Sequence, residues 1–259
     1  QLVAEVPLGA FLSGGIDSSV VTGLARRHKP DLHTFSIGFK DEKFFDETPY
    51  AQLVSRHLGT EHTVFQLSNV EMSSHLHNIL DSLDEPFADS SAIAVYMLSR
   101  ETRRHATVAL SGDGADELLG GYNKYAAFFR SLHPGMPEHL VTALKPVWSI
   151  LPKSRHAPFA NRFRQLNRYA QGATLSSRDR YWRWASFAND REASRLIRKE
   201  WMTDSQVAIR RNEWLGTLPD KESINDILLT DMRLVLPNDM LTKVDRMSMA
   251  LALEVHNTF

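Results

Sequence analysis

The sequence predicts an α/β fold in which a parallel sheet is covered by helices on both faces. Short runs rich in β-branched and aromatic residues recur through the first half of the chain, and helical segments of about ten to fifteen residues separate them. Parallel strands joined by helices need right-handed crossover connections, which bury the sheet from both sides. Ligands of such sheets bind at the carboxyl edge, so the loops that follow strands are the first candidates for a site.

Four strands and four helices are expected before residue 111. The strands are predicted at residues 3–12, 32–39, 61–67 and 107–110. The helices are predicted at residues 19–28, 46–59, 69–83 and 92–104, and Gly59 is expected to end the second of them. After Tyr122 the pattern is helical and is broken by Pro and Gly, so we expect no further strand there. Residues 1–130 are predicted to form the α/β core, and residues 131–259 a mainly helical part of the same domain.

Composition favours a soluble globular protein. The 259 residues carry a formal net charge of −1, so the charge balance favours neither nucleic acid nor an anionic membrane as a partner. Aromatic and arginine side chains alternate at residues 178–184, where we expect the tryptophans to pack inward and the arginines to face water. We find neither a long apolar run nor a leader, which makes a cytoplasmic location our expectation. The absence of cysteine excludes thiolate metal sites and a cysteine nucleophile within this stretch.

The first candidate site is the loop after residues 6–12, which reads Ser13-Gly14-Gly15-Ile16-Asp17-Ser18. Its glycines let backbone N–H groups approach an anion, and Ser18 or Ser19 can cap the helix whose positive end faces the loop. No Gly-Lys-Ser/Thr follows, so this is not a Walker loop. An acid such as Asp17 can stand beside phosphate only if a divalent cation lies between them.

A second glycine-rich loop follows the last predicted strand. It spans residues 111–122 and contains three acids and four glycines. A dinucleotide fingerprint is disfavoured because Glu117 stands at the third glycine position, and the acids do not follow EF-hand spacing. Taken alone, the loop could be an acidic surface turn. Both glycine-rich loops follow strands, however, so they are expected to meet at one edge of the sheet.

Three segments together carry a resemblance to a known family. Residues 13–18 match the pyrophosphate loop of the ATP pyrophosphatases, which cleave ATP between the α- and β-phosphates. With the loop 111–122 and the stretch 236–250, they make the chain similar to the synthetase domain of glutamine-dependent asparagine synthetases. The similarity is also strong at residues 84–91 and loose between 123 and 220. It implies a parallel Rossmann-like sheet of the ATP pyrophosphatase (adenine nucleotide alpha hydrolase-like) type with a helical C-terminal part, whose stretch 236–255 returns to the active site.

The resemblance also implies roles for individual residues. Pyrophosphate contacts fall on Ser13, Gly14, Gly15, Asp17 and Ser18. Adenosine contacts fall on Phe11, Leu12, Ile37, Ser111 and Gly112. Mg²⁺ would be held by Asp17 and Asp116, Lys243 would be the catalytic lysine, and Asp113 would handle substrate or intermediate. The alternative for Lys243 is a solvated helix lysine, whereas Asp239, Asp245 and Arg246 are expected to form ion pairs or caps.

The implied function is an ATP-dependent ligase that adenylates the side-chain carboxylate of aspartate and transfers ammonia to give asparagine, with release of AMP and pyrophosphate. The alternatives are an AMP-forming cyclase of the β-lactam or lasso-peptide macrolactam synthetase type, or a non-catalytic nucleotide-binding module. Asp113 favours the ligase, because β-lactam synthetase has tyrosine there. The implied partners are ATP, aspartate, ammonia and an N-terminal glutaminase domain that this stretch lacks, and a homodimer is an open alternative. We expect no glutaminase activity without a cysteine, and both ends resemble those of a fragment or a divergent copy.

Overall fold

The computed structural model describes residues 2–155, 157–201, 204–216, 218 and 223–259. The chain forms two compact units: Gln1–Leu118 together with Val235–Phe259, and Leu119–Leu234. Within the described residues, no helix combines the length and the apolar character needed to cross a bilayer.

The first unit contains a five-stranded parallel sheet, which confirms the predicted fold class. Its strands are β1 (Leu8–Phe11), β2 (His33–Phe39), β3 (Glu61–Leu67), β4 (Val108–Ser111) and β5 (Glu254–Asn257). Their order is β3-β2-β1-β4-β5, and every neighbouring pair is parallel. The first strand is shorter than residues 3–12, because Pro7 has no N–H to donate and Val3 is fully exposed.

The fifth strand was not expected, so the prediction of no strand after Tyr122 is wrong. β5 lies at the edge of the sheet and pairs with β4 in the register Val108↔Glu254. The Thr258 hydroxyl extends the pairing by donating to the Ser111 carbonyl at 3.0 Å. These four residues contain a single β-branched side chain, Val255, and this local pattern is too weak to predict a strand. The strand forms because β4 offers it hydrogen-bond partners.

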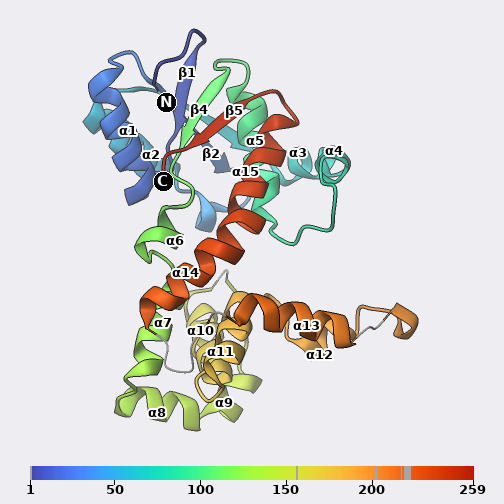
Figure 1. Cartoon of the computed structure of the whole chain (residues 1–259). Coiled ribbons are helices and arrows are strands. Elements are labelled where there is room, and N and C mark those ends of the chain that lie inside the picture. The colour runs from blue at the N-terminus through green and yellow to red at the C-terminus, as the bar shows by residue number, and fades with distance from the viewer. Residues whose placement is uncertain (1, 156, 202–203, 217, 219–222) are drawn as a thin grey trace. The chain divides into compact units, whose positions relative to one another are not determined.

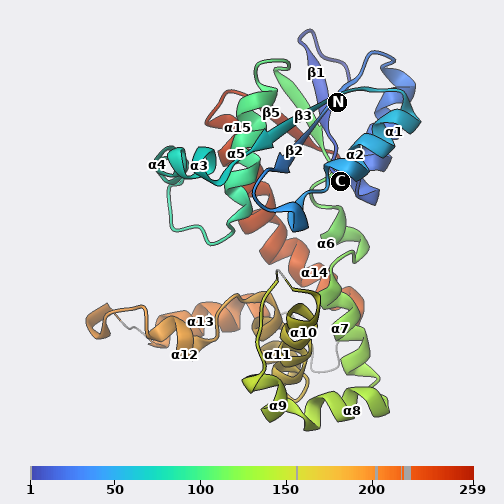
Figure 2. The ribbon, with the colours of Figure 1, turned by 180° about the vertical axis from the view of Figure 1, so that it is seen from behind.

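Helices cover both faces of this sheet (Figure 1). On one face, α1 (Ile16–His28) buries Val21 and Ala25 against Leu8, Ala10 and Val108, and α2 (Thr48–Leu58) lies beside it. On the other face, α5 (Ser91–Thr102) packs along α15 (Thr242–Met249), and both contribute to a second cluster. The view from behind shows the same two layers (Figure 2). As predicted, α2 ends at Gly59, which has the positive φ of 68° that favours glycine.

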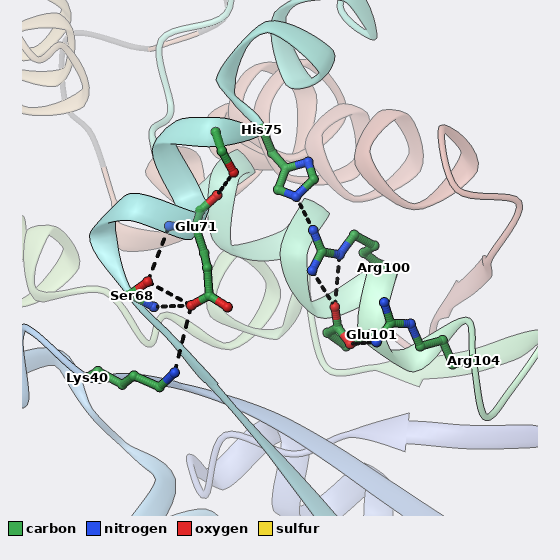
Figure 3. A network of polar contacts seen from close by, with 8 residues as sticks. Lys40, Ser68, Glu71, His75, Arg100, Glu101 and Arg104 are labelled. Carbon is green, nitrogen blue, oxygen red and sulfur yellow. Dashed lines mark hydrogen bonds and ion pairs between the residues drawn. The ribbon is translucent and has the colours of Figure 1, made fainter.

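The helix predicted at residues 69–83 is two helices, α3 (Asn69–Ser74) and α4 (Leu76–Asp81). A capping box starts α3, in which Glu71 accepts from the Ser68 backbone N–H at 2.8 Å. The break falls at His75, whose ring Nε2 accepts from Arg100 of α5, and Arg100 also donates to Glu101 (Figure 3). The break in this segment, whose local periodicity favours one continuous helix, thus coincides with a contact to another helix.

Shorter helical pieces complete the first unit: η1 (Lys43–Phe45), α6 (Ala115–Leu119) and η3 (Leu236–Leu241), the last a π-helical turn directly before α15. Pro237 cannot donate a backbone hydrogen bond inside η3, and its carbonyl accepts from the Thr242 hydroxyl at 2.7 Å. This widened π-helical turn leads directly into α15, the helix that carries Lys243.

The second unit is helical in its described part. Its elements are α7 (Asn123–Leu132), α8 (Met136–Ala143), α9 (Lys145–Ile150), α10 (Pro158–Gly172), α11 (Ser177–Ala185), α12 (Asp190–Ser194), η2 (Lys199–Trp201), α13 (Asp204–Leu215) and α14 (Ile224–Val235). Trp184 of α11 is buried, as expected for the tryptophans of that stretch, whereas Trp182 is half-buried against the same core; Tyr181 is buried as well. Arg180 departs from the expectation, because it is half-buried and donates to the Leu175 carbonyl at 3.0 Å.

A buried carboxylate anchors the core of the second unit. Asp231 of α14 is fully buried and accepts from the hydroxyls of Tyr125 and Tyr181, each at 2.5 Å. Lys124 donates to the same carboxylate at 2.6 Å and neutralises it. Burial, together with the adjacent Asp231 charge, raises the pKa of the Tyr181 hydroxyl far above its usual range, so the phenol stays a donor.

We predict that Asp231→Ala destabilises the protein by about 3–5 kcal/mol, because the Lys124 ammonium and two buried phenol hydroxyls lose their acceptor. Denaturant unfolding monitored by circular dichroism measures the change. Asn225→Ala, on the exposed side of the same helix, is the control and should stay within about 0.5 kcal/mol of wild type. A loss below about 1 kcal/mol for Asp231→Ala would contradict the anchoring role.

Candidate functional site

Hydroxyl groups close the first glycine-rich loop into a compact turn between β1 and α1. The Ser13 and Ser18 hydroxyls lie 3.0 Å apart, and the Gly15 N–H donates to the Ser13 hydroxyl at 3.2 Å. The predicted capping role of Ser18 or Ser19 is wrong: Gly15 is the N-cap, and both serine hydroxyls donate back to its carbonyl, at 3.3 and 2.6 Å. These serines sit in the first turn of α1, where both hydroxyls donate to the Gly15 carbonyl. The backbone N–H that the Ser18 hydroxyl accepts, at 3.3 Å, is that of Ser13 in the loop and not one of the helix.

Two of the glycines in these loops cannot be replaced without displacing backbone. Gly14 has φ +84°, and a Cβ there would come within 2.5 Å of the backbone of Tyr50 and Ala51 in α2. A Cβ on Gly112 would lie 2.9 Å from the Ser18 backbone nitrogen and 3.2 Å from the Asp17 carbonyl carbon. The two glycine-rich loops therefore touch each other directly, backbone against backbone, as the sequence predicts for loops at one edge of the sheet.

The second loop turns sharply at the end of β4. The Ser111 hydroxyl donates to the Asp113 carboxylate, and the Asp113 N–H donates back to that hydroxyl at 3.3 Å. Gly114 has φ +97°, and a Cβ there would lie 3.3 Å from the Leu236 side chain. Contact with Leu236 brings the loop against the start of the segment 236–250. Asp113 and Asp116 are both partly exposed, so their carboxylates are accessible to a ligand.

The proposed adenosine contacts differ in what they can offer. Phe11 ends β1 and is partly exposed, whereas the Leu12 side chain is buried and its N–H donates to the Phe35 carbonyl at 2.9 Å. Ile37 lies in β2 and packs against the buried cluster that includes Tyr96 and Met97. Leu12 as a whole is 1% exposed, so it offers a ligand very little surface.

Lys243 is a buried residue, which rules out the alternative of a solvated helix lysine. Its side chain is 4% exposed, and its Nζ donates to Asp89 Oδ2 at 2.8 Å and to Met240 Sδ at 3.4 Å. One turn further along α15, Arg246 forms an ion pair with Asp84, as expected of an ion-pairing residue. The helix is thereby tied at two points to the stretch 84–91.

Asp89 is a residue that sequence reasoning left without a role. Burial raises the pKa of its carboxyl, but hydrogen bonds from Lys243 and Ser91 outweigh this, and the net effect is a lowered pKa. A carboxyl whose pKa is lower in the folded chain than in the unfolded one adds stability at neutral pH. That stability is lost as the pH falls through the folded-state pKa. The available signal was an acid just ahead of Ser90-Ser91 at the start of a predicted helix.

The residues expected to hold Mg²⁺ were Asp17 and Asp116. In the part of the chain that the structure describes, no group of three or more His, Cys, Asp or Glu side chains is arranged to hold a metal by itself. Carboxylate oxygens completed by phosphate oxygens and water are nevertheless the donor set that Mg²⁺ prefers. The contact between Gly112 and Ser18 places the loops of Asp17 and Asp116 together, so these residues fit a metal shared with a phosphate ligand.

Comparisons with known proteins agree on one family. The family model described as "Asparagine synthase" matches residues 1–259. An "Asparagine synthetase [glutamine-hydrolyzing] 1" of Bacillus subtilis (strain 168) is 33% identical over 258 residues, which is 99% of this chain and 39% of that protein. A "Putative asparagine synthetase [glutamine-hydrolyzing] 2" of Methanocaldococcus jannaschii is 33% identical over 99% of this chain and 48% of that protein.

A "Putative asparagine synthetase [glutamine-hydrolyzing]" of Mycobacterium tuberculosis (strain ATCC 25618 / H37Rv) is 35% identical over 99% of this chain and 38% of that protein. These relatives are considerably longer, and the chain spans less than half of each. The family model and the relatives all cover the sheet, both glycine-rich loops and the Lys243 segment, and the chain belongs to the asparagine synthase family.

Proposed function

We propose that this chain is an AMP-forming, ATP-dependent ligase that activates the side-chain carboxylate of aspartate and transfers ammonia to it, giving asparagine. Membership of the asparagine synthase family supports the class of reaction. The observation that carries the proposal furthest is the backbone contact between Gly112 and residues Asp17 and Ser18. It joins a loop suited to phosphate with a loop that carries two accessible acids, Asp113 and Asp116.

The reaction has two steps. In the first, a carboxylate oxygen of aspartate attacks the α-phosphorus of ATP, and the bond to the bridging oxygen breaks, so that pyrophosphate leaves and an aspartyl adenylate forms. In the second, ammonia attacks the activated carbonyl, loses a proton and expels AMP. Negative charge grows on the leaving pyrophosphate in the first step, and groups placed where it grows lower the barrier most.

Each candidate residue has a part in this scheme. Ser13, Gly14, Gly15 and Ser18 form the turn that would receive the pyrophosphate portion, next to the start of α1. Asp17 and Asp116 would hold Mg²⁺, which neutralises phosphate charge when bound. Asp113, tied to Ser111, would face the adenylate. Lys243 would place its ammonium near the leaving group.

The position of Lys243 depends on how the chain returns to the sheet. Val235–Phe259 belongs to the same compact unit as the first loop and residues 111–118 of the second, and Leu236 lies against Gly114. These facts support the proposal that residues 236–255 return to the active site of a core formed by residues 1–130.

The first prediction from this scheme concerns the products. With ATP, Mg²⁺, ammonium and a panel of carboxylic acids, we expect aspartate to drive the formation of AMP and pyrophosphate in equal amounts. Glutamine should not replace ammonium, since these residues include no cysteine nucleophile. Chromatography of nucleotides and amino acids measures the products. Formation of ADP and phosphate would contradict the assignment. Release of AMP without ammonium, together with an amide formed within the acid substrate, would favour the cyclase. Nucleotide binding without turnover would favour the binding module.

Asp17→Asn and Asp116→Asn should each lower kcat by about 10²-fold or more, because each removes half of the carboxylate charge expected to hold the metal. The fold should survive, since both side chains are partly exposed. Initial rates of pyrophosphate release across a Mg²⁺ titration provide the measurement. Asp31→Asn is the matched control, because this exposed acid pairs only with Lys29 in the described structure. Near-normal rates in either site variant would remove the shared metal from the mechanism.

Lys243→Ala should lower kcat by about 10²–10³-fold, equivalent to about 3–4 kcal/mol of transition-state stabilisation, and change ATP affinity much less. The charge matters most when pyrophosphate leaves, whereas ground-state ATP also has the loop and the metal. Single-turnover rates and nucleotide titrations separate the two quantities. Arg246→Ala removes the more exposed cation of the same helix and should leave kcat within about threefold of wild type. An unchanged kcat in Lys243→Ala would exclude this lysine from catalysis.

A further inference from the structure

Two ion pairs join the stretch 84–91 to helix α15, and they differ in burial. Lys243 pairs with Asp89, with 4% and 19% of their side chains exposed, whereas Arg246 pairs with Asp84, with 46% and 71% exposed. Exposed pairs contribute little to stability because water screens them. A buried ammonium, in contrast, is strongly unfavourable without a counter-ion. The Asp89 contact is therefore the one that Lys243 depends on.

The Asp89 carboxylate is itself held at a fixed place. Its Oδ1 accepts from the Ser91 N–H at 2.9 Å, and its Oδ2 accepts from the Ser91 hydroxyl at 2.7 Å. These bonds fix it just before α5, a helix that runs back from the carboxyl edge of the sheet toward β4. The lysine that Asp89 holds thus lies at the edge where the glycine-rich loops end. The pKa of the Asp89 carboxyl is lowered, which keeps this carboxylate ionised at neutral pH.

The ammonium has capacity left for a ligand. A lysine has three N–H donors, and Lys243 directs two of them to Asp89 and to the weakly accepting sulfur of Met240. Within the described part of the chain, no further acceptor of Lys243 is found. A group that is charged, buried and only partly satisfied is suited to an anionic oxygen.

We infer that Asp89 is the positioning residue of Lys243: it holds the ammonium at the carboxyl edge of the sheet, aimed for a phosphate oxygen, without touching the reacting atoms itself. This inference rests on the proposed function, because the phosphate is that of ATP. It assigns a role to a carboxylate 154 residues before the lysine in the sequence.

Turnover tests what the pair does. Asp89→Asn keeps the size of the side chain and removes its charge, and we expect kcat to fall about 10²-fold while the KM for ATP changes less than about threefold. In the Lys243→Ala background the same change should have no further effect on kcat, because Asp89 acts through the lysine. Asp84→Asn, which breaks the exposed pair between the same two segments, should match wild type in both quantities. An equal fall of kcat in both backgrounds would show a structural role only and would overturn the inference.

Chemical labelling tests the holding itself, without any reaction. Lys243 should react slowly with an amine-directed reagent in the wild-type chain, and at least about tenfold faster in Asp89→Asn, while Asp84→Asn leaves the rate unchanged. Mass spectrometry of the labelled peptide identifies the site, and circular dichroism checks that each variant is folded. Unchanged labelling in a folded Asp89→Asn variant would overturn the inference.

A second variant covers the case in which Asp89→Asn does not fold. Ser91→Ala keeps the ion pair and removes only the hydroxyl that orients the carboxylate, so we expect kcat to fall several-fold at unchanged KM, and only when Lys243 is present. No such fall would overturn the inference. If the wild-type chain forms no AMP with any acid, the proposed function fails, and the labelling result still decides whether Asp89 holds Lys243.

Discussion

The contact between Gly112 and the backbone of Asp17 and Ser18 is the constraint on which the site depends. β1 and β4 are neighbours in the sheet, paired at Leu8↔Val108, so the loops that follow them leave the same edge about one strand spacing apart. Where Gly112 meets Asp17 and Ser18 the loops approach more closely still, and a Cβ there would lie 2.9 Å from the Ser18 nitrogen. Glycine at position 112 lets the two loops close on each other, and the acids of the second loop come within reach of whatever the first loop binds.

Much of this arrangement could be predicted from the sequence, because it follows from local patterns. The strand from Glu61 to Leu67 was expected at its observed bounds, and Gly59 ends its helix in the positive-φ conformation that only glycine adopts freely. β5 could not be predicted in the same way. Its four residues form a strand only because β4 is next to them, and the break at His75 coincides with a contact to Arg100 of another helix. Both features involve contacts between distant segments.

The candidate site likewise has parts that local sequence patterns predict and a part that depends on contacts between distant segments. Both glycine-rich loops are short, continuous motifs, and the sequence predicted their convergence from the topology alone. The partner of Lys243 is different in kind, because Asp89 stands just before another helix, and the acid ahead of Ser90-Ser91 marks a helix start and not a partner for a lysine. Burial carries that information: the lysine is 4% exposed, and a charge removed from water requires a counter-charge, so its neighbour in space had to be an acid.

A comparison of the two buried lysine–carboxylate pairs shows why only one of them has a functional reading. In the helical unit, Asp231 receives two phenol hydroxyls and an ammonium, and Lys124 also lies over the rings of Tyr122 and Tyr125. That network is suited to stability, because each partner fixes the others. Lys243, by contrast, has one strong acceptor and one weak one within the described residues, and under our proposal it stands at the edge of the sheet where the loops meet. A protein that needed only to neutralise a buried charge could surround it fully. Leaving an ammonium partly satisfied costs stability, and that cost is understandable where an anionic ligand completes the coordination.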